Sequence, residues 1–250
     1  MAKSAPSVRL FVEAALGAGA GVAASPEQAH YLLNVMRLGA GATVALFNGR
    51  DGEWQATVTV PAKRHIAFEL ARQTRPQAPE PDLWLAFAPV KRVEFLAEKA
   101  SELGVAALLP VFTQHTSINR VNVARLRANA LEAAEQCDRL SVPLIHEPVS
   151  FDKFLGAWPP ARRLYFLDET GGGAPIATAL AAAKTGTAPE PAGFLTGPEG
   201  GFAQSELDAL RQLPFASALG LGPRLLRAET AALAAVACWQ AILGDWAARG

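Results

Sequence analysis

The first third of the chain carries the alternating apolar and polar pattern of strands with one buried face. Residues 8–12 and 65–71 alternate, and residues 43–47 and 54–60 flank an Asn48-Gly49 turn signal. Alternation places every second side chain on the same face of a strand, and Asn-Gly between two such runs is typical of a hairpin. This pattern predicts a small β-rich barrel.

One helix interrupts the β-rich region. Ser25, Pro26 and Gln28 form the pattern of a capping box with proline in the first turn. Apolar residues at positions 29, 32, 33 and 36 follow on one helical face, and Gly39 is an end signal. The spacing predicts a helix from Pro26 to near Gly39.

A proline-rich stretch separates this region from the rest of the chain. Pro76, Pro79 and Pro81 lie within residues 72–82, and proline prevents both helix propagation and sheet pairing. We expect a linker there, with one domain over residues 1–74 and a second over residues 82–250.

Beyond the linker the hydrophobic period changes. The apolar run at 83–88, the amphipathic segment 91–103 and the apolar run at 105–111 predict a strand, a helix and a second strand. Runs that are apolar without alternation indicate a sheet covered on both faces. We expect further strands at 164–167, 193–196 and 216–219, and further helices at 121–139, 176–183, 204–213 and 229–247. The second domain is therefore predicted to be α/β.

Composition supports a globular protein. The chain has 250 residues, of which 50% are hydrophobic and 18% charged, so a disordered chain is excluded and a large core is available without disulfides. Apolar runs stop short of the ~18 residues that a membrane span needs. Glu13 interrupts the early apolar stretch, so we expect no signal peptide and a cytoplasmic location.

The numbers and spacing of cysteine and histidine residues do not indicate a metal site or a disulfide framework. Cys137 and Cys238 are too few for a disulfide framework or a four-cysteine zinc site, and we interpret them as small buried side chains. The four histidines show no ligand spacing, so we expect no metal site; they are His30, His65, His115 and His146.

Charge is unevenly distributed although the net charge is zero. The first 128 residues hold 14 basic and 10 acidic side chains, and the remainder hold 9 and 13. A polyanionic partner is therefore expected to contact the first half of the chain.

Three glycine-containing loops each follow a predicted strand and precede a predicted helix. They cover residues 168–173, 195–202 and 219–230. Ligands of open α/β sheets bind beyond the carboxyl ends of strands, so these loops predict a pocket, with simple structural turns as the alternative. None of the loops matches a P-loop or a dinucleotide fingerprint, and Glu199 would repel a phosphate. A ligand with an amine, a ribose or a cationic centre fits better.

Arg224, Arg227 and Glu229 gather at the start of the most apolar predicted helix. A helix N-terminus favours anions, and arginines beside it would strengthen an anion site. A local ion pair at a helix start is the alternative interpretation.

Six motifs occur in a fixed order along the chain. They are Arg9-Leu10-Phe11, residues 30–37, residues 91–94 with Lys99 and 102–105, residues 132–139 with Pro143, residues 197–202 and residues 219–231. With these motifs the chain resembles the RsmE family of small-subunit rRNA uridine N3-methyltransferases, part of the SPOUT superfamily. The match covers nearly the whole sequence, and the last two motifs together are its most specific part.

The resemblance implies an α/β SPOUT-type methyltransferase domain with a C-terminal trefoil knot, preceded by a PUA-like RNA-binding β-barrel. It further implies S-adenosyl-L-methionine (SAM) as cofactor and a homodimer built through the C-terminal domain. The expected reaction is methylation of N3 of a uridine in 16S rRNA of the small ribosomal subunit, which in the family is uridine 1498.

The resemblance also suggests roles for particular residues. The candidate catalytic residues are Arg227, to stabilise negative charge on the uracil, and Glu199, to orient Arg227 or bind the cofactor. The candidate cofactor-binding residues are Leu167, Thr196, Gly197, Glu199, Gly201, Leu219, Gly220, Leu221, Gly222, Leu226 and Arg227.

RNA is expected to contact basic residues of the first half. The candidates are Arg9, His30, Arg37, Lys91 and Arg92, with Lys63 and Arg64 as further surface cations. One departure concerns Thr113–Ser117, where the family often has an acidic-arginine-serine run, so the role of this stretch is open.

Two other functions are consistent with the residues alone. The chain would be a non-catalytic RNA-binding or ribosome-assembly module if the glycine loops were only scaffold. It would be a different SPOUT methyltransferase if the acceptor were a tRNA or a ribose 2′-hydroxyl.

Overall fold

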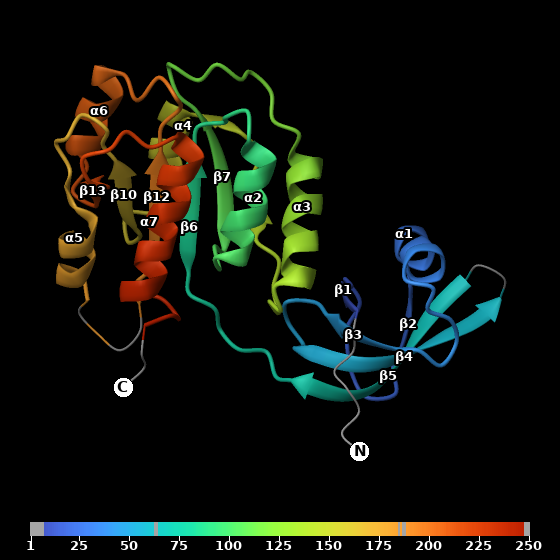
Figure 1. Ribbon diagram of the computed structural model, residues 1–250. Helices are drawn as coiled ribbons and strands as arrows, with labels where there is room; N and C mark the ends of the chain where they lie inside the picture. The colour runs from blue at the N-terminus through green and yellow to red at the C-terminus, as the bar shows by residue number, and fades with distance from the viewer. Residues whose placement is uncertain (1–7, 63–64, 185, 187–188, 248–250) are drawn as a thin grey trace. The chain divides into compact units, whose positions relative to one another are not determined.

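The computed structural model describes residues 8–62, 65–184, 186 and 189–247 (Figure 1). Chain contacts divide these residues into two units. The first contains the described residues up to Pro79 together with Ala134–Val142, and the second contains Glu80–Ala133 and the described residues from Pro143 onward. The sequence pattern does not indicate that residues 134–142 join the first unit.

The first unit is built on a five-stranded sheet with the order β1-β3-β4-β5-β2. The strands are β1 (Arg9–Phe11), β2 (Gly21–Ala23), β3 (Thr43–Phe47), β4 (Glu53–Ala62) and β5 (His65–Arg75). Strand β1 pairs parallel to β3, and the other neighbours pair antiparallel. The expected strands are confirmed except that β5 continues to Arg75, so the linker begins after the strand rather than at residue 72.

The predicted helix is shorter and differently wound than expected. The capping box at Ser25 and Gln28 is present and opens α1 (Pro26–His30), but a π-helical turn over Tyr31–Val35 follows it. The apolar positions fit either winding. The wider turn keeps Leu32 in the core and Leu33 against it, whereas Tyr31 and Val35 are exposed. The prediction of one α-helix to Gly39 is therefore wrong.

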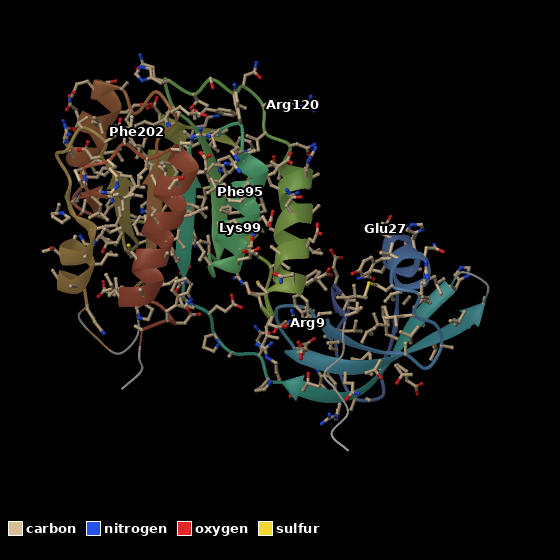
Figure 2. The ribbon with its side chains drawn as sticks, viewed as in Figure 1. Arg9, Glu27, Phe95, Lys99, Arg120 and Phe202 are labelled. Atoms are coloured by element: carbon tan, nitrogen blue, oxygen red, sulfur yellow. The ribbon has the colours of Figure 1, made fainter. Side chains whose placement is uncertain are left out.

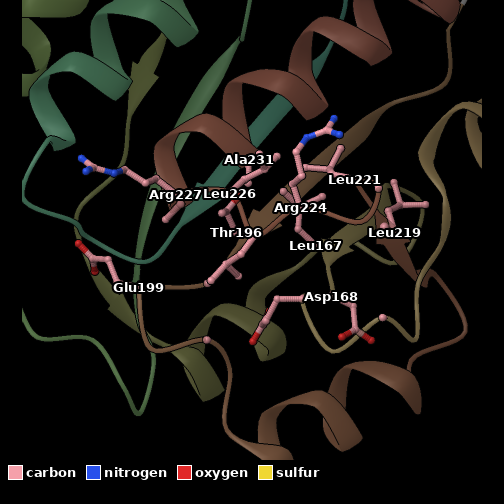
Figure 3. A pocket seen from close by; sticks show the side chains of 18 of the residues that line it. Leu167, Asp168, Thr196, Glu199, Leu219, Leu221, Arg224, Leu226, Arg227 and Ala231 are labelled. Atoms are coloured by element: carbon pink, nitrogen blue, oxygen red, sulfur yellow. The ribbon is translucent and has the colours of Figure 1, made fainter.

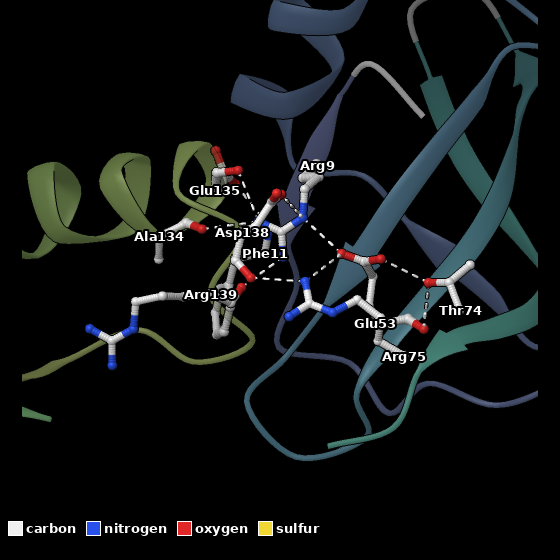
Figure 4. A network of polar contacts seen from close by, with 9 residues as sticks. All are labelled: Arg9, Phe11, Glu53, Thr74, Arg75, Ala134, Glu135, Asp138 and Arg139. Atoms are coloured by element: carbon white, nitrogen blue, oxygen red, sulfur yellow. Dashed lines mark hydrogen bonds and ion pairs between the residues drawn. The ribbon is translucent and has the colours of Figure 1, made fainter. Parts of the chain in front are cut away.

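Arg9 is a structural residue of the first unit (Figure 4). Its Nε donates to Glu53 at 2.8 Å, and its other two nitrogens donate to the backbone carbonyls of Ala134, Glu135 and Arg139. The guanidinium also stacks on the ring of Phe47. Because all three nitrogens are engaged inside the unit, the expectation that Arg9 contacts RNA phosphate is wrong.

The second unit contains an eight-stranded parallel sheet. Its main order is β11-β13-β10-β12-β6-β7-β8, and β9 pairs with β7. The strands are β6 (Leu83–Phe87), β7 (Ala107–Phe112), β8 (Leu144–Ile145), β9 (Val149–Ser150), β10 (Arg163–Leu167), β11 (Ala174–Pro175), β12 (Ala192–Thr196) and β13 (Ala216–Gly220).

Helices cover both faces of this sheet, as the continuous apolar strands predict (Figure 1). They are α2 (Val93–Glu102), α3 (Val123–Gln136), α4 (Phe151–Ala157), α5 (Ile176–Ala182), α6 (Gln204–Arg211) and α7 (Ala228–Ile242). Helices α4 and α6 share one core with Leu164, Phe166 and Leu195, whereas α2 and α5 both contact α7. Within the described residues no helix is long and apolar enough to cross a membrane.

The sheet order decides where the functional loops lie. Strand β10 sits between β13 and β12 and runs parallel to both. Carboxyl ends of parallel neighbours meet at one edge, so the loops that follow these three strands meet there although they are far apart in sequence.

A candidate active site at one edge of the parallel sheet

The three loops enclose a cavity of about 490 Å³ (Figure 3). It is lined by residues after β10, after β12 and after β13, and by the first turn of α7. In Figure 3, Asp168 lies on one side of this space and Ala231 of α7 lies on the other. A cavity of this size is typical of small-molecule sites.

All the predicted cofactor-binding residues line this one cavity. They are Leu167, Thr196, Gly197, Glu199, Gly201, Leu219, Gly220, Leu221, Gly222, Leu226 and Arg227. The structure thus brings them together, and their roles in binding stay a prediction. The lining also includes Arg224, which the sequence placed beside a possible anion site, and residues that were not among the cofactor-binding candidates. The latter are Asp168, Glu169, Gly171, Pro198, Pro223, Leu225, Ala228 and Ala231.

Glycines let the backbone approach closely around the cavity. A Cβ at Gly197 would lie 3.1 Å from the ring of Phe202, and one at Gly220 would lie 3.1 Å from the carbonyl oxygen of Gly173. Gly201 has φ of +70°, a conformation that other L-residues rarely adopt. The shape of the cavity therefore depends on glycine at these positions.

The stretch 113–117 helps to hold the loop after β12. The carboxylate of Glu206 accepts from the backbone N–H of Gln114 at 2.9 Å and from that of Ala203 at 2.9 Å. The ring Nδ1 of His115 lies 3.2 Å from the carbonyl oxygen of Gly201. The stretch 113–117, which departs from the family pattern, thus has a structural part in the site.

Asp168 anchors the loop after β10. Its side chain is fully buried and accepts from the backbone N–H and hydroxyl of Thr170 and from Nη2 of Arg211. Burial raises the pKa of this carboxyl, but the Thr170 hydrogen bonds and Arg211 outweigh it and hold the pKa below its usual value. The residue stays ionised and fixed at the cavity wall.

Arg227 and Glu199 both have exposed side chains at the cavity. Arg227 is the N-cap residue of α7, so the positive end of that helix lies beside it. Within the described part of the chain, no ion pair joins Arg227 to Glu199, so the expected orientation of one by the other is not seen here. Glu229 instead lies 3.7 Å from Arg92.

The cavity fits a nucleoside with a cationic centre. The hydroxyl of Thr196 is buried at its wall and has no hydrogen-bond partner among the described residues, and such groups normally find one. Glycine backbone and a buried hydroxyl suit an adenosine, and the carboxylates suit a sulfonium or an amine. The residues present therefore fit SAM.

The predicted RNA-binding residues lie at two places. His30 is exposed at the end of α1, and Arg37 is exposed just after the π-helical turn, with φ of +54°. Lys91 and Arg92 are exposed before α2, where Arg92 stacks on the ring of Phe95, which Figure 2 shows with Lys99 along that helix. Lys63 and Arg64 lie outside the described residues.

Comparison with known families decides the membership of the chain. Residues 76–240 match the family described as RNA methyltransferase domain, and residues 25–71 match the RNA methyltransferase PUA domain. The chain belongs to the RNA methyltransferase family. The expected architecture, a PUA domain followed by an α/β methyltransferase domain, is confirmed by these matches and by the two sheets.

Curated members of this family resemble the chain over most of its length. A ribosomal RNA small subunit methyltransferase E from Rickettsia conorii is 29% identical over 216 residues, covering 86% of both chains. The protein of the same name from a Synechocystis strain is 29% identical over 221 residues, covering 86% of this chain and 71% of the relative.

Solved structures of the family share the fold. A protein from Legionella pneumophila with bound cofactor SAM superposes with a TM-score of 0.83 at 27% identity, covering 95% of this chain and 98% of that one. The ribosomal RNA small subunit methyltransferase E from Neisseria gonorrhoeae, bound to SAM, has the same TM-score of 0.83 at 24% identity and covers 96% and 99%.

Proposed function

We propose that the chain is a SAM-dependent methyltransferase that modifies N3 of a uridine in 16S rRNA of the small ribosomal subunit, the position of uridine 1498 in the family. The observation that carries the proposal is the glycine-lined cavity, whose wall holds a buried hydroxyl without a partner. The names and bound SAM of the relatives support it.

The acceptor nitrogen determines what the protein must supply. Uracil N3 carries a proton, and its loss spreads negative charge over O2 and O4. When bound, SAM supplies an electrophilic methyl group, and no metal is needed for that chemistry. Arg227 is exposed at the cavity beside the positive end of α7 and is placed to stabilise the anion, as donors of an oxyanion hole do.

The loops of the site and Glu199 are proposed to hold and orient the cofactor without taking part in the reaction themselves. The fixed loops hold the backbone that would surround the nucleoside, so the two reactants meet in line. Glu199, exposed at the same cavity, is proposed to bind donor groups of the cofactor.

We further propose how the rest of the protein contributes. Residues 1–74 would act as the PUA-like RNA-binding domain and residues 82–250 as the SPOUT domain with a C-terminal trefoil knot. Basic residues His30, Arg37, Lys91 and Arg92 would contact the RNA backbone. The protein would be cytoplasmic and form a homodimer through the second domain.

The decisive experiment combines binding with mapping of the product. Calorimetry of the purified chain should show stoichiometric SAM binding. Incubation with small subunits from cells lacking this gene should then add one methyl group to N3 of a single 16S uridine, located by mass spectrometry. Failure to bind SAM would leave a non-catalytic RNA-binding module, and a methyl group on tRNA or on a ribose would replace the proposed acceptor.

A further inference from the structure

Glu169 occupies a special place in the cavity wall. It follows Asp168 directly after β10, and its side chain crosses to the loop after β12, where Oε1 accepts from the backbone N–H of Phe202 at 3.1 Å. Phe202 is itself buried against Gly197. One carboxylate oxygen is therefore fixed by the loop that forms the opposite wall.

The neighbouring glycine makes room for this carboxylate. A Cβ on Gly201 would collide with Oε1 of Glu169, and the φ of +70° at Gly201 independently favours glycine. The backbone at Gly201 therefore leaves just enough room for the Glu169 carboxylate, and this close fit fixes the position of its charge.

The charge of Glu169 is not neutralised by the protein. Asp168 beside it is paired with Arg211 at 2.9 Å, but among the described residues no lysine, arginine or histidine forms an ion pair with Glu169. Glu199 is also unpaired at the cavity, but no hydrogen bond within the described residues fixes it. Glu169 is therefore the carboxylate with both a free charge and a fixed position.

We propose that Glu169 is a specificity-determining residue that makes the cavity prefer a cationic nucleoside, SAM, over the neutral thioether S-adenosylhomocysteine. The inference rests on the proposed function. The carboxylate of Glu169 is exposed and is held at the cavity by the Phe202 N–H, so it attracts a sulfonium bound there. This attraction vanishes when the ligand loses its positive charge. The same residue thereby favours exchange of the used cofactor for a fresh one.

Two ligands that differ by one charge allow a direct test. Calorimetry should show that Glu169→Gln raises the Kd for SAM about five- to tenfold and leaves the Kd for S-adenosylhomocysteine within about twofold. Glutamine retains an oxygen for the Phe202 N–H, so the loop contact is kept. Glu147→Gln is the matched control, because Glu147 forms an exposed pair with Arg127 away from the cavity and should change neither Kd.

Structural damage gives a different result from loss of charge. Equal weakening of both ligands in Glu169→Gln, or no change in either, would overturn the inference. Glu169→Asp keeps the charge, so its ratio of the two Kd values should stay as in the wild type even if both affinities fall. This variant still tests the inference if Glu169→Gln fails to fold. A wild-type chain that binds neither ligand refutes the proposed function itself, and the inference falls with it.

Discussion

At the scale of single residues, Arg227 is the residue proposed to stabilise the uracil anion during methyl transfer. Its guanidinium is exposed, has no ion-pair partner within the described residues and lies at the N-cap of α7. Arg227→Ala should lower the methylation rate at saturating rRNA and SAM about 100- to 1000-fold, the usual effect of removing one donor to a developing anion. The Kd for SAM, measured by calorimetry, should stay within a few fold.

The control for this change is an arginine outside the cavity. Arg125→Ala removes an exposed pair with Glu94 on the surface and should leave the rate unchanged. A wild-type turnover of the Arg227 variant would remove that side chain from the mechanism.

Gly201 tests whether the fitted wall matters to ligand binding. Gly201→Ala introduces backbone strain and a collision that displaces the carboxylate of Glu169. In calorimetry it should therefore weaken SAM about tenfold or more and S-adenosylhomocysteine by less, a factor of ten corresponding to ~1.4 kcal/mol. Gly19→Ala is the control: it shares a φ of +73° but meets nothing within 4 Å. It should cost about 1–2 kcal/mol of stability and leave both ligand affinities unchanged. Unaltered binding by the Gly201 variant would show that the collision is absorbed elsewhere.

At the scale of elements, the sequence predicted what periodicity can encode. Strands with long apolar or alternating runs, such as β3 and β12, were found almost to the residue. Strands β8, β9 and β11 have two residues each and were missed, because two residues carry no period. Helix α4 was also missed, because its seven residues are too few to establish a helical period.

The same limit applies to the site. Three loops after three strands predicted a shared cavity, because parallel strand ends meet at one edge. Contacts between distant residues, such as Glu169 with the N–H of Phe202 or Arg9 with Glu53, have no local signature. The sequence therefore reveals neither the contact of Glu169 across the cavity wall nor the structural role of Arg9.

The contacts of Arg9 lead to a stability prediction for the first unit. Arg9→Ala would remove the 2.8 Å ion pair of the buried Glu53 carboxylate, which would keep only the Thr74 hydroxyl and the more distant Arg75, and it would leave three carbonyls without their donor. We expect a loss of about 3 kcal/mol, as for other broken buried pairs. Amide hydrogen exchange in β3 and β4 measures this directly, because protection reports on the local unit.

An exposed arginine of the same unit gives the comparison. Arg50→Ala removes a surface pair with Asp51 and should cost less than about 1 kcal/mol. Equal protection losses in the two variants would contradict a structural role for Arg9.

The turn between β3 and β4 should also be sensitive to acid. The backbone N–H of Leu16 and the side chain of Asn48 hold the pKa of Asp51 at about 2. A folded-state pKa below the unfolded value of about 3.9 means that ionised Asp51 stabilises the fold above that pH, and that this contribution is lost as pH falls toward 2. Between these pH values, the free energy of unfolding measured with urea should change less with pH in Asp51→Asn than in the wild type. Identical slopes of this free energy against pH in the two proteins would contradict the assignment.

At the scale of the whole molecule, binding of RNA must use a chain with no net charge. The basic excess lies in the first 128 residues, and the exposed cations Arg37 and Lys91 belong to different units. Contributions from both units would let one RNA engage the PUA domain and the methyltransferase domain together. Local cations, not the net charge, would then set the affinity.

Salt dependence measures how many of these cations contact phosphate. Affinity for purified 16S rRNA should fall as salt rises from about 50 to 200 mM, since each phosphate contact releases counterions. Arg37→Ala and Lys91→Ala should each reduce the slope of log affinity against log salt by about 0.7–1, and the double variant by about twice that. Arg163→Ala removes an exposed cation at the start of β10, at the edge of the sheet opposite to Lys91, and should leave the slope unchanged. A slope that responds to only one of the two substitutions would restrict RNA binding to a single unit, because additivity requires both to contact the same molecule.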